Sequence, residues 1–277
     1  ENVPALAGVD TRALTLKLRE GGTQKGFLCT TGFVAPEDAV EKARSWEGLD
    51  GQDYASKVST PETYDWPSEA PADAPLVAVL DFGIKFNTLR LLAEHGFRVR
   101  VLNAHAAAGE ILALKPAGVM LSNGPADPSA LPYAVETIRS LLGKVPLMGI
   151  CLGCQEMNVA AGGTLYRHIP DDMPAALEHR RTRPPAETWH DVELVADTLL
   201  YSLLGSTSIR CNSSHHQAVG RLAVPFQAIA HSSDGVIEAF TLREAGGRFL
   251  LALQWHPERI WQQPYQLKLF QALVAAC

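Results

Sequence analysis

From residue 76 onward, short apolar runs alternate with amphipathic stretches along the chain. The apolar runs predict strands, and they lie at residues 76–80, 97–102, 118–121 and 145–150. The amphipathic stretches between them predict helices, which lie at residues 85–95, 107–114 and 131–142. Such alternation favours right-handed βαβ units with helices on both faces of one sheet. We therefore predict an α/β fold with a doubly wound, mostly parallel sheet.

After residue 161 the pattern changes to shorter β-like runs. These runs lie at residues 191–195, 208–211, 226–230, 236–241 and 249–254, and a last helix is expected at 265–275. Residues 168–187 are rich in proline, arginine and histidine, which is typical of a surface excursion. The cluster of arginines that begins at Arg180 is expected to lie in a solvated loop. Contact between this cluster and an anionic group is the alternative.

The first 60 residues predict a small N-terminal α+β module. Asp10 is a plausible cap for a helix that runs to about residue 18, residues 26–30 are strand-like, and Pro36 opens a second helix. Residues 61–75 contain four prolines together with acidic residues, which indicates an exposed linker. We therefore expect a truncated N-terminal module at 1–60, a linker at 61–75 and the main domain at 76–277.

Composition excludes several classes of function. With 24 Lys and Arg against 30 Asp and Glu, the net charge is -6, and no basic run suggests a nucleic-acid partner. No apolar run is long enough to span a membrane, and the first residues lack the pattern of a secretory signal. Five scattered cysteines argue against a disulfide scaffold and for a reducing compartment. A cytoplasmic protein is expected.

Candidate chemistry centres on Cys151. The residues Gly149-Ile150-Cys151-Leu152-Gly153 stand between a predicted strand and a helix-like stretch at 156–161. This spacing matches a nucleophile elbow, in which flanking glycines let the backbone pass closely around a strained turn. A thiol at a helix N-terminus is favoured as the thiolate. Cys151 is therefore predicted to attack an acyl carbon.

A thiolate nucleophile needs a base and a group that orients the base. His256 follows the strand predicted at 249–254, and Glu258 stands two residues further on, separated from it by a proline. We predict that Glu258 bonds one imidazole nitrogen while the other faces the thiol. The backbone N–H groups of Leu152 and Gly124 are the candidates for an oxyanion hole.

These motifs together resemble a known family. Residues 122–128 (SNGPADP), 149–155 (GICLGCQ) and 256–258 (HPE) are similar in sequence, order and separation to the motifs of class I (triad) glutamine amidotransferases. The resemblance implies a flavodoxin-like fold and a γ-glutamyl thioester formed on the cysteine. It makes Cys151 the nucleophile, His256 the base and Glu258 the orienting residue, with Leu152 and Gly124 as oxyanion-hole amides.

The resemblance also implies substrate contacts. Gln155 matches a substrate-contacting glutamine, and further contacts are expected from Asn123, Ser214, His215 and His216. Adjacent residues in a strand point to opposite faces, so one of the two histidines is expected to be structural and the other to line the pocket. They could instead be metal ligands or an acid/base pair. Nothing in the motifs calls for a metal or an organic cofactor.

Two narrower resemblances divide the chain at the elbow. Residues 1–150 resemble the small, glutamine-hydrolysing chain of carbamoyl-phosphate synthetase, through segments 7–15, 81–85 and 121–125. Residues 151–277 resemble the γ-glutamyl-γ-aminobutyrate hydrolase (peptidase C26) family, through segments 155–160, 162–166, 212–219, 233–239 and 254–258. Cys154 and Ala126 depart from the synthetase pattern, which has histidine and glycine, respectively, at these two positions. Leu152 departs from the hydrolase pattern. We hypothesise a recombined or engineered chain.

Three functions stay open at this point. The first is cysteine-dependent hydrolysis of a γ-glutamyl amide, either glutamine or a γ-glutamyl-amine, and it is the reading we favour. The second is a glutaminase small chain that passes ammonia to a large synthetase chain. The third is a binding module that keeps the fold without catalysis. The pair Cys151 and Cys154 could alternatively be redox-active or half of a zinc site, but no second C-x-x-C completes such a site.

Overall fold

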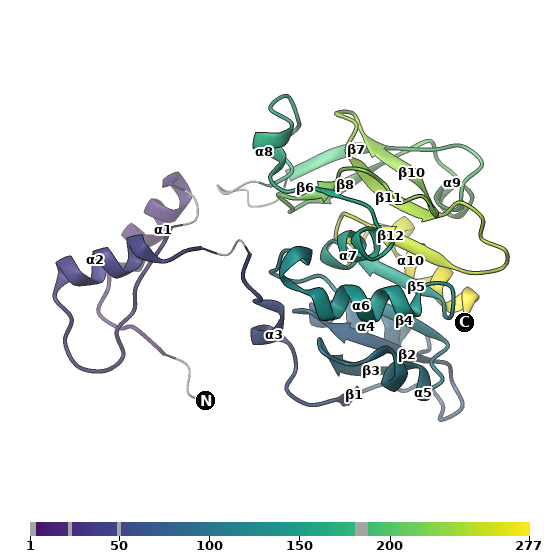
Figure 1. Ribbon diagram of the computed structural model, residues 1–277, viewed down its shortest axis with the longest axis horizontal. Coiled ribbons are helices and arrows are strands. Elements are labelled where there is room, and N and C mark those ends of the chain that lie inside the picture. Colours follow the sequence, from purple (N-terminus) through teal and green to yellow (C-terminus); the bar gives the residue numbers. More distant parts are fainter. Residues whose placement is uncertain (1–3, 22–23, 49–50, 181–187) are drawn as a thin grey trace.

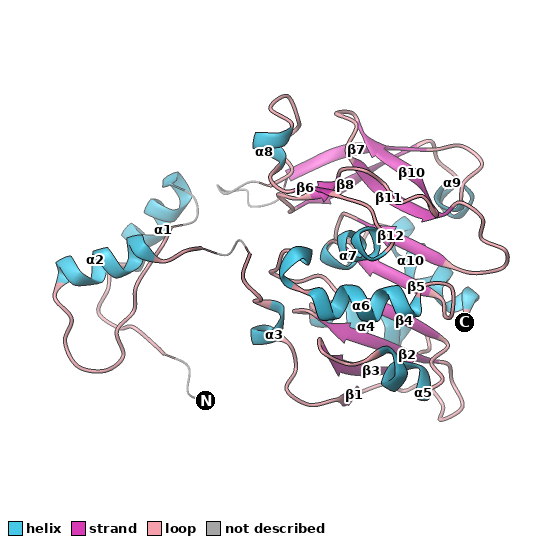
Figure 2. Cartoon of the chain, in the orientation of Figure 1, coloured by secondary structure: helices cyan, strands magenta, loops and turns pink. Residues whose placement is uncertain are grey.

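The computed structural model describes residues 4–21, 24–48, 51–180 and 188–277. Its centre is a single mixed sheet in the strand order β1-β3-β2-β4-β5-β12-β11-β10-β7-β8, with β9 also paired to β11 and β6 to β9 (Figure 1). The predicted α/β class is confirmed. Figure 2 shows the strands in one continuous layer with helices in front and behind.

The strands that position Cys151 form the parallel half of the sheet. They are β2 (Leu76–Asp81), β3 (Arg98–Asn103), β4 (Gly118–Leu121), β5 (Leu147–Ile150) and β12 (Leu250–Leu253). Every residue of β4, β5 and β12 is buried. Continuous burial is typical of parallel strands covered on both faces, and it explains why the sequence shows apolar runs here.

The C-terminal runs form the antiparallel half. They are β7 (Thr188–Leu194), β8 (Ser208–Ser213), β10 (Phe226–Ser232) and β11 (Ile237–Leu242). Two short strands, β6 (Leu165–Tyr166) and β9 (Ala218–Val219), extend this half beside β11. Buried and exposed residues alternate strictly along β7, as expected for a strand with one solvated face.

Helices cover the two faces of the sheet separately. Alternate residues of one strand, such as Val77 and Ala78, belong to the two different cores. The core that contains Val77 is closed by α4 (Phe86–Glu94), α9 (Leu199–Leu204) and α10 (Pro264–Ala276). The core that contains Ala78 is closed by α5 (Ala108–Ala113), α6 (Pro132–Leu141) and α7 (Leu152–Ala160). The doubly wound arrangement is therefore present.

The N-terminal part differs from its predicted form. It contains α1 (Thr11–Gly21), α2 (Pro36–Ser45) and α3 (Ala55–Val58), and the strand expected at 26–30 does not form among the described residues. A strand needs a pairing partner, and residues 26–30 are exposed throughout. No residue of α2 is buried, and Figure 1 shows α1 and α2 beside the sheet, away from its two faces.

The proline-rich segment is more ordered than expected. Within it, β1 (Tyr64–Trp66) pairs antiparallel with β3 at the edge of the sheet. Prolines are tolerated at such an edge because one side of the strand needs no ladder hydrogen bonds. The surface excursion predicted before residue 180 contains the single-turn helix α8 (Ile169–Asp172). Two short 3-10 turns, η1 (Pro128–Ala130) and η2 (Pro257–Arg259), lie close in sequence to the candidate motifs. Within the described residues, no helix is both long and apolar enough to cross a membrane.

Candidate active site

Cys151 occupies a strained turn between β5 and α7. Its backbone has φ 52° and ψ -103°, a region that residues with a Cβ rarely adopt. A Cβ on Gly149 would lie 2.8 Å from the backbone of Gly153, and a Cβ on Gly153 would lie 2.5 Å from the carbonyl oxygen of Leu121. Both glycines are thus required by close backbone approach, which is the geometry that the sequence spacing predicts.

The next strand of the sheet carries the histidine. Because β12 runs parallel to β5 in register, with Leu253 opposite Ile150, the residues that follow the two strands meet at the same edge. The N–H of Cys151 donates to the carbonyl oxygen of Leu253 at 2.7 Å, which ties the turn to β12. His256 therefore emerges beside the thiol.

A buried carboxylate holds His256 in place. Nδ1 of His256 lies 2.8 Å from Oε1 of Glu258, and the two residues are 3% and 1% exposed. The backbone N–H of His256 donates to Oδ1 of Asn212 at 3.2 Å, and Nδ2 of Asn87 donates to the carbonyl oxygen of Glu258. Sequence analysis gave neither asparagine a role, and their contacts come from elements distant in the chain.

The charges around His256 change its protonation. Burial by itself lowers the pKa of the imidazole, but the negative charges of Glu258 and Cys151 oppose this and raise the pKa of His256 to about 9. At neutral pH the arrangement therefore favours an imidazolium beside the sulfur of Cys151. Such a pair can attack an acyl carbon and then protonate the departing nitrogen.

The two residues expected to supply oxyanion-hole amides, Leu152 and Gly124, are close neighbours at the pocket. Leu152 begins α7, so its N–H belongs to the first helical turn, where amides lack an intrahelical partner. Gly124 follows β4 in the neighbouring loop, and a Cβ there would overlap the carbonyl oxygen of Phe82 and lie 2.9 Å from Cδ2 of Leu152. Both residues line the pocket above Cys151.

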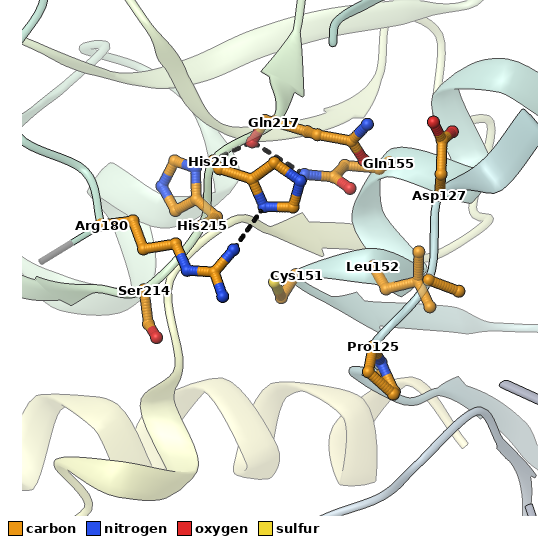
Figure 3. A pocket seen from close by; sticks show the side chains of 12 residues that line it. Pro125, Asp127, Cys151, Leu152, Gln155, Arg180, Ser214, His215, His216 and Gln217 are labelled. Carbon is orange, nitrogen blue, oxygen red and sulfur yellow. Dashed lines mark hydrogen bonds between the residues drawn. The ribbon is translucent and has the colours of Figure 1, made fainter. Parts of the chain in front are cut away.

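The pocket brings together residues from four separate segments (Figure 3). Its lining consists of Gly124, Pro125, Ala126, Asp127, Cys151, Leu152, Gln155, Arg180, Ser214, His215, His216 and Gln217. Of the expected substrate contacts, the lining includes Gln155, Ser214, His215 and His216. Asn123 is not part of it, since its side chain donates to the carbonyl oxygen of Gly83 at 3.2 Å and so ties two loops together.

The side chain of Gln155 is held at the pocket floor. Its Nε2 donates to the carbonyl oxygen of Gln217 at 2.9 Å and to Oε1 of Gln254 at 3.2 Å. Nε2 of Gln254 in turn lies 3.8 Å from Sγ of Cys151. Gln254 was not singled out from the sequence, although it directly precedes the Trp-His-Pro-Glu motif.

The two adjacent histidines have different surroundings. His215 is buried, and its Nδ1 lies 2.9 Å from the carbonyl oxygen of Gln217. His216 faces the pocket, where its Nδ1 accepts a hydrogen bond of 3.0 Å from Nη1 of Arg180. Figure 3 shows Arg180 and Asp127 on opposite sides of the pocket, with Cys151 between them. From the sequence, a solvated loop was favoured for Arg180, with contact to an anionic group as the alternative, and Asp127 was given no role.

Cys154 does not form a second reactive thiol. It faces the core from the first turn of α7, it is fully buried, and burial raises its pKa well above the ordinary value. A thiol in that state is a poor nucleophile and a poor metal ligand. The surroundings of Cys154 favour acyl transfer at Cys151 over redox chemistry of the pair.

Comparison with known proteins adds to this geometry. Residues 127–258 match the Peptidase C26 family. The carbamoyl phosphate synthase small chain of Pseudomonas syringae pv. tomato is 45% identical over 175 residues, which cover 58% of this chain and 46% of the relative. The corresponding small chain of Ralstonia nicotianae is 35% identical over 272 residues, which cover 93% of this chain and 65% of the relative. The chain thus matches 46% of the length of the first relative and 65% of the length of the second.

The long match to the small chain of Ralstonia nicotianae crosses Cys151. The similarity to carbamoyl phosphate synthase therefore continues past the position where the sequence analysis placed a change of resemblance. The match to the Peptidase C26 family begins before that position, at residue 127. The two resemblances thus overlap over most of the main domain.

Solved structures share the fold. A protein of Thermoplasma acidophilum described as a candidate GMP synthase component has a TM-score of 0.60 at 18% identity, covering 75% of this chain and 96% of that one. A glutamine amidotransferase of Thermotoga maritima has a TM-score of 0.50 at 18% identity, covering 72% and 85%. At this level of identity the likeness extends to the fold alone.

Proposed function

Since the chain resembles the class I glutamine amidotransferases in sequence and fold, we propose that it hydrolyses the side-chain amide of glutamine through a γ-glutamyl thioester. The observation that carries the proposal is Cys151 on a strained turn beside the buried pair of His256 and Glu258. The products would be glutamate and ammonia. Cys151 acts as the nucleophile, His256 as the proton carrier and Glu258 as the group that orients the imidazole.

Acylation follows from this arrangement. The thiolate of Cys151 attacks the γ-carbonyl carbon, and the electron pair of the C=O bond moves to oxygen. The N–H groups of Leu152 and Gly124 stabilise that oxyanion. His256, protonated because Glu258 and the thiolate raise its pKa to about 9, gives its proton to the departing nitrogen. The C–N bond breaks and ammonia leaves.

Deacylation reverses the proton transfer. Neutral His256 removes a proton from water, the resulting hydroxide attacks the thioester carbon, and the C–S bond breaks to regenerate the thiolate. Glu258 holds the ring so that Nε2 keeps facing the reacting atoms in both steps. Because its Oε1 lies 2.8 Å from Nδ1, it also stabilises the imidazolium each time it forms.

The charges of the pocket support an amino-acid substrate. Arg180 and Asp127 face the pocket from opposite sides, so a cation and an anion flank the space above Cys151. The α-carboxylate and α-ammonium groups of a γ-glutamyl compound have the complementary charges. We assign Arg180 to the carboxylate and Asp127 to the ammonium group.

The relatives support glutamine over larger γ-glutamyl-amines as the substrate. The carbamoyl phosphate synthase small chain of Ralstonia nicotianae matches 93% of this chain, and the name of a small chain implies a larger partner. Transfer of the released ammonia to a large synthetase chain is therefore part of the proposal. Hydrolysis of a γ-glutamyl-amine is the second candidate, because residues 127–258, which include most of the pocket, match the Peptidase C26 family.

The test compares glutamate release from glutamine and from γ-glutamyl-γ-aminobutyrate. The native chain and Cys29→Ser, which changes an exposed cysteine far from the site in sequence, are expected to hydrolyse glutamine at equal rates. Cys151→Ser is expected to release no glutamate. Preference for γ-glutamyl-γ-aminobutyrate would select the second candidate, and no release from either substrate by a folded native chain would leave the non-catalytic binding module.

A further inference from the structure

A second group of ionisable side chains adjoins the pocket, and the proposed reaction does not use it. It consists of His179, His190, His215 and Glu238, which are 2%, 8%, 3% and 0% exposed. Three histidine nitrogens face one carboxylate oxygen. Measured from Oε1 of Glu238, Nε2 of His190 lies at 3.0 Å, Nδ1 of His179 at 3.5 Å and Nε2 of His215 at 3.7 Å.

The fold brings these residues together at the end of a strand. In the sheet, β10 separates β7 from β11, and Val192 of β7 pairs with Ser232, the last residue of β10. His190 therefore lies beyond the end of β10, and Glu238 of β11 stands at the bulge in the pairing of β10 with β11, between Ile237 and Ala239. His215 comes from the loop after β8, which pairs with β7 on its other side.

The hydrogen bonds of His215 leave one ring nitrogen without a proton in the neutral form. Its Nδ1 lies 2.9 Å from the carbonyl oxygen of Gln217, which can only accept, so Nδ1 carries the hydrogen. In the neutral ring, the lone pair of Nε2 then points toward Glu238. A lone pair that faces a carboxylate oxygen is repelled unless a cation lies between them.

His179 has the same arrangement with its nitrogens exchanged. Its Nε2 lies 2.9 Å from Oδ2 of Asp234, so Nε2 donates and Nδ1 holds the lone pair. Ser213 lies 3.3 Å from that Nδ1, but its hydroxyl already donates to the carbonyl oxygen of His179 at 2.7 Å. A histidine that donates one N–H to a carboxylate and presents its other nitrogen is the usual outer arrangement of a metal ligand.

Several polar atoms of this group make no hydrogen bond of good geometry, although Nε2 of His190 lies 3.0 Å from Oε1 of Glu238. Within the part of the chain that the structure describes, this holds for both oxygens of Glu238, both nitrogens of His190 and Nε2 of His215. Polar atoms without partners in a fully buried position carry a large desolvation cost. A cation bound between them would satisfy Nε2 of His190, Nε2 of His215 and Oε1 of Glu238 together.

We infer that His179, His190, His215 and Glu238 form a binding site for one divalent transition-metal cation of the zinc class. Tetrahedral ligands at about 2.0–2.1 Å from zinc lie about 3.3 Å apart, and the separations of 3.0, 3.5 and 3.7 Å from Glu238 bracket that value. The ligand atoms of His179, His190 and Glu238 all lie within 4.8 Å of one another. Imidazole and carboxylate ligands suit zinc and its neighbours in the first transition series.

Charge supports the same occupant. The group contains two buried carboxylates, Glu238 as a ligand and Asp234 behind His179. One divalent cation balances these two charges. With four protein ligands the site is closed, which is typical of structural sites. Through His215 the metal fixes the loop that forms one wall of the pocket.

The experiment measures zinc bound to untagged full-length chain. Metal is removed with a chelator, zinc is added back, and bound zinc is counted by mass spectrometry of the metal after desalting. Cys151→Ser is measured in parallel, because the catalytic thiolate could itself take up zinc. The variants are His190→Gln and Glu238→Gln, with His231→Gln on β10 as the matched control, since His231 lies outside the group.

The native chain, Cys151→Ser and His231→Gln are each expected to bind one zinc and to gain thermal stability from it. His190→Gln and Glu238→Gln are expected to bind zinc at least about 100-fold more weakly, because loss of an outer partner alone costs about 10–100-fold. Absence of bound zinc in the native chain, or equal binding by His190→Gln and His231→Gln, would overturn the inference.

Cobalt(II) in the native chain tests the geometry without any variant. The inference requires the strong visible absorption of a tetrahedral cobalt centre with nitrogen and oxygen ligands. The weak bands of an octahedral centre, or charge-transfer bands from a thiolate, would place the cation elsewhere and contradict the assignment. This arm keeps the inference testable even if Glu238→Gln fails to fold.

Discussion

Glu258 is the residue at which the proposed mechanism can be tested most quantitatively. The pKa of His256 is raised from 6.5 to about 9, which corresponds to about 3 kcal/mol in favour of the imidazolium. A single opposite charge near 4 Å at an effective dielectric constant of about 20 contributes about 4 kcal/mol. Burial lowers the pKa of His256, so Glu258, whose Oε1 is 2.8 Å from Nδ1, and Cys151 together supply more than the net shift.

Glu258→Gln keeps the size of the side chain and removes its charge. We expect the pKa of His256 to fall by about two units, which is about 2.7 kcal/mol of lost imidazolium stabilisation. The same loss in the transition state would lower kcat/KM for glutamine about 100-fold. Glu244→Gln, which changes an exposed glutamate in the loop before β12, is the matched control and should leave kcat/KM unchanged.

The assay is the pH dependence of glutamate release, measured from about pH 5 to about pH 10 so that both pKa values are bracketed. In the native chain the activity should fall as pH rises through about 9, because His256 then loses the proton that the leaving nitrogen needs. In Glu258→Gln this alkaline limb should move to about pH 7. A folded variant with native kcat/KM and an unmoved limb would refute the orienting role.

Three further predictions concern the pocket and the core. Arg180→Gln should raise KM for glutamine about tenfold with little change in kcat, because one charged hydrogen bond to the substrate is lost. The control Arg210→Gln, on the exposed face of β8, should leave KM unchanged. Equal KM values for the two variants would remove Arg180 from the binding site. Gly124→Ala should lower kcat about 100-fold or more, because a Cβ would displace the loop whose N–H is proposed to stabilise the oxyanion. Stopped-flow or steady-state rates equal to those of the native chain would contradict this. Burial raises the pKa of Glu156 well above its ordinary value, so the free energy of unfolding should fall as pH rises above that ordinary value. Glu156→Gln should therefore add about 1–3 kcal/mol to the free energy of unfolding near pH 8 and less near pH 5. Urea denaturation at both pH values tests this, and the exposed control Glu193→Gln should show no change.

The parts of the fold that local pattern determines could be predicted from the sequence. The buried strands β2, β4 and β5 form continuous apolar runs, and the helices between them have clear boundaries. The turn at Cys151 is equally local, because its glycines stand two residues away on each side. His256 and Glu258 are close in sequence, so their hydrogen bond could also be expected.

Other features depend on contacts between distant segments. Arg180 reaches the pocket only because the segment before it folds against β8, where the N–H of His215 donates to the carbonyl oxygen of His179 at 3.1 Å. The strand β1 forms in a proline-rich segment because the free edge of β3 lies beside it. A signal for Asp127 was present in its place next to the SNGP loop, and it could have been included on that ground.

The group around Glu238 had no signature in the sequence. Its histidines lie at positions 179, 190 and 215, and this spacing matches no compact metal motif. They meet because His190 lies on β7 just past the end of β10, while His179 and His215 come from segments that fold against the same end of the sheet. Sequence analysis raised a metal-ligand role for His215 as an alternative, but His179, His190 and Glu238, which would complete the site, were given no such role.

The thioester on Cys151 is the central claim, and intact-mass spectrometry tests it most directly. The native chain is mixed with excess glutamine, quenched in acid within the turnover time, and digested to locate any adduct. The account predicts a mass increase of one γ-glutamyl group on the peptide that contains Cys151, and none in Cys151→Ser. An adduct on another residue, or steady glutamate release by Cys151→Ser, would contradict it.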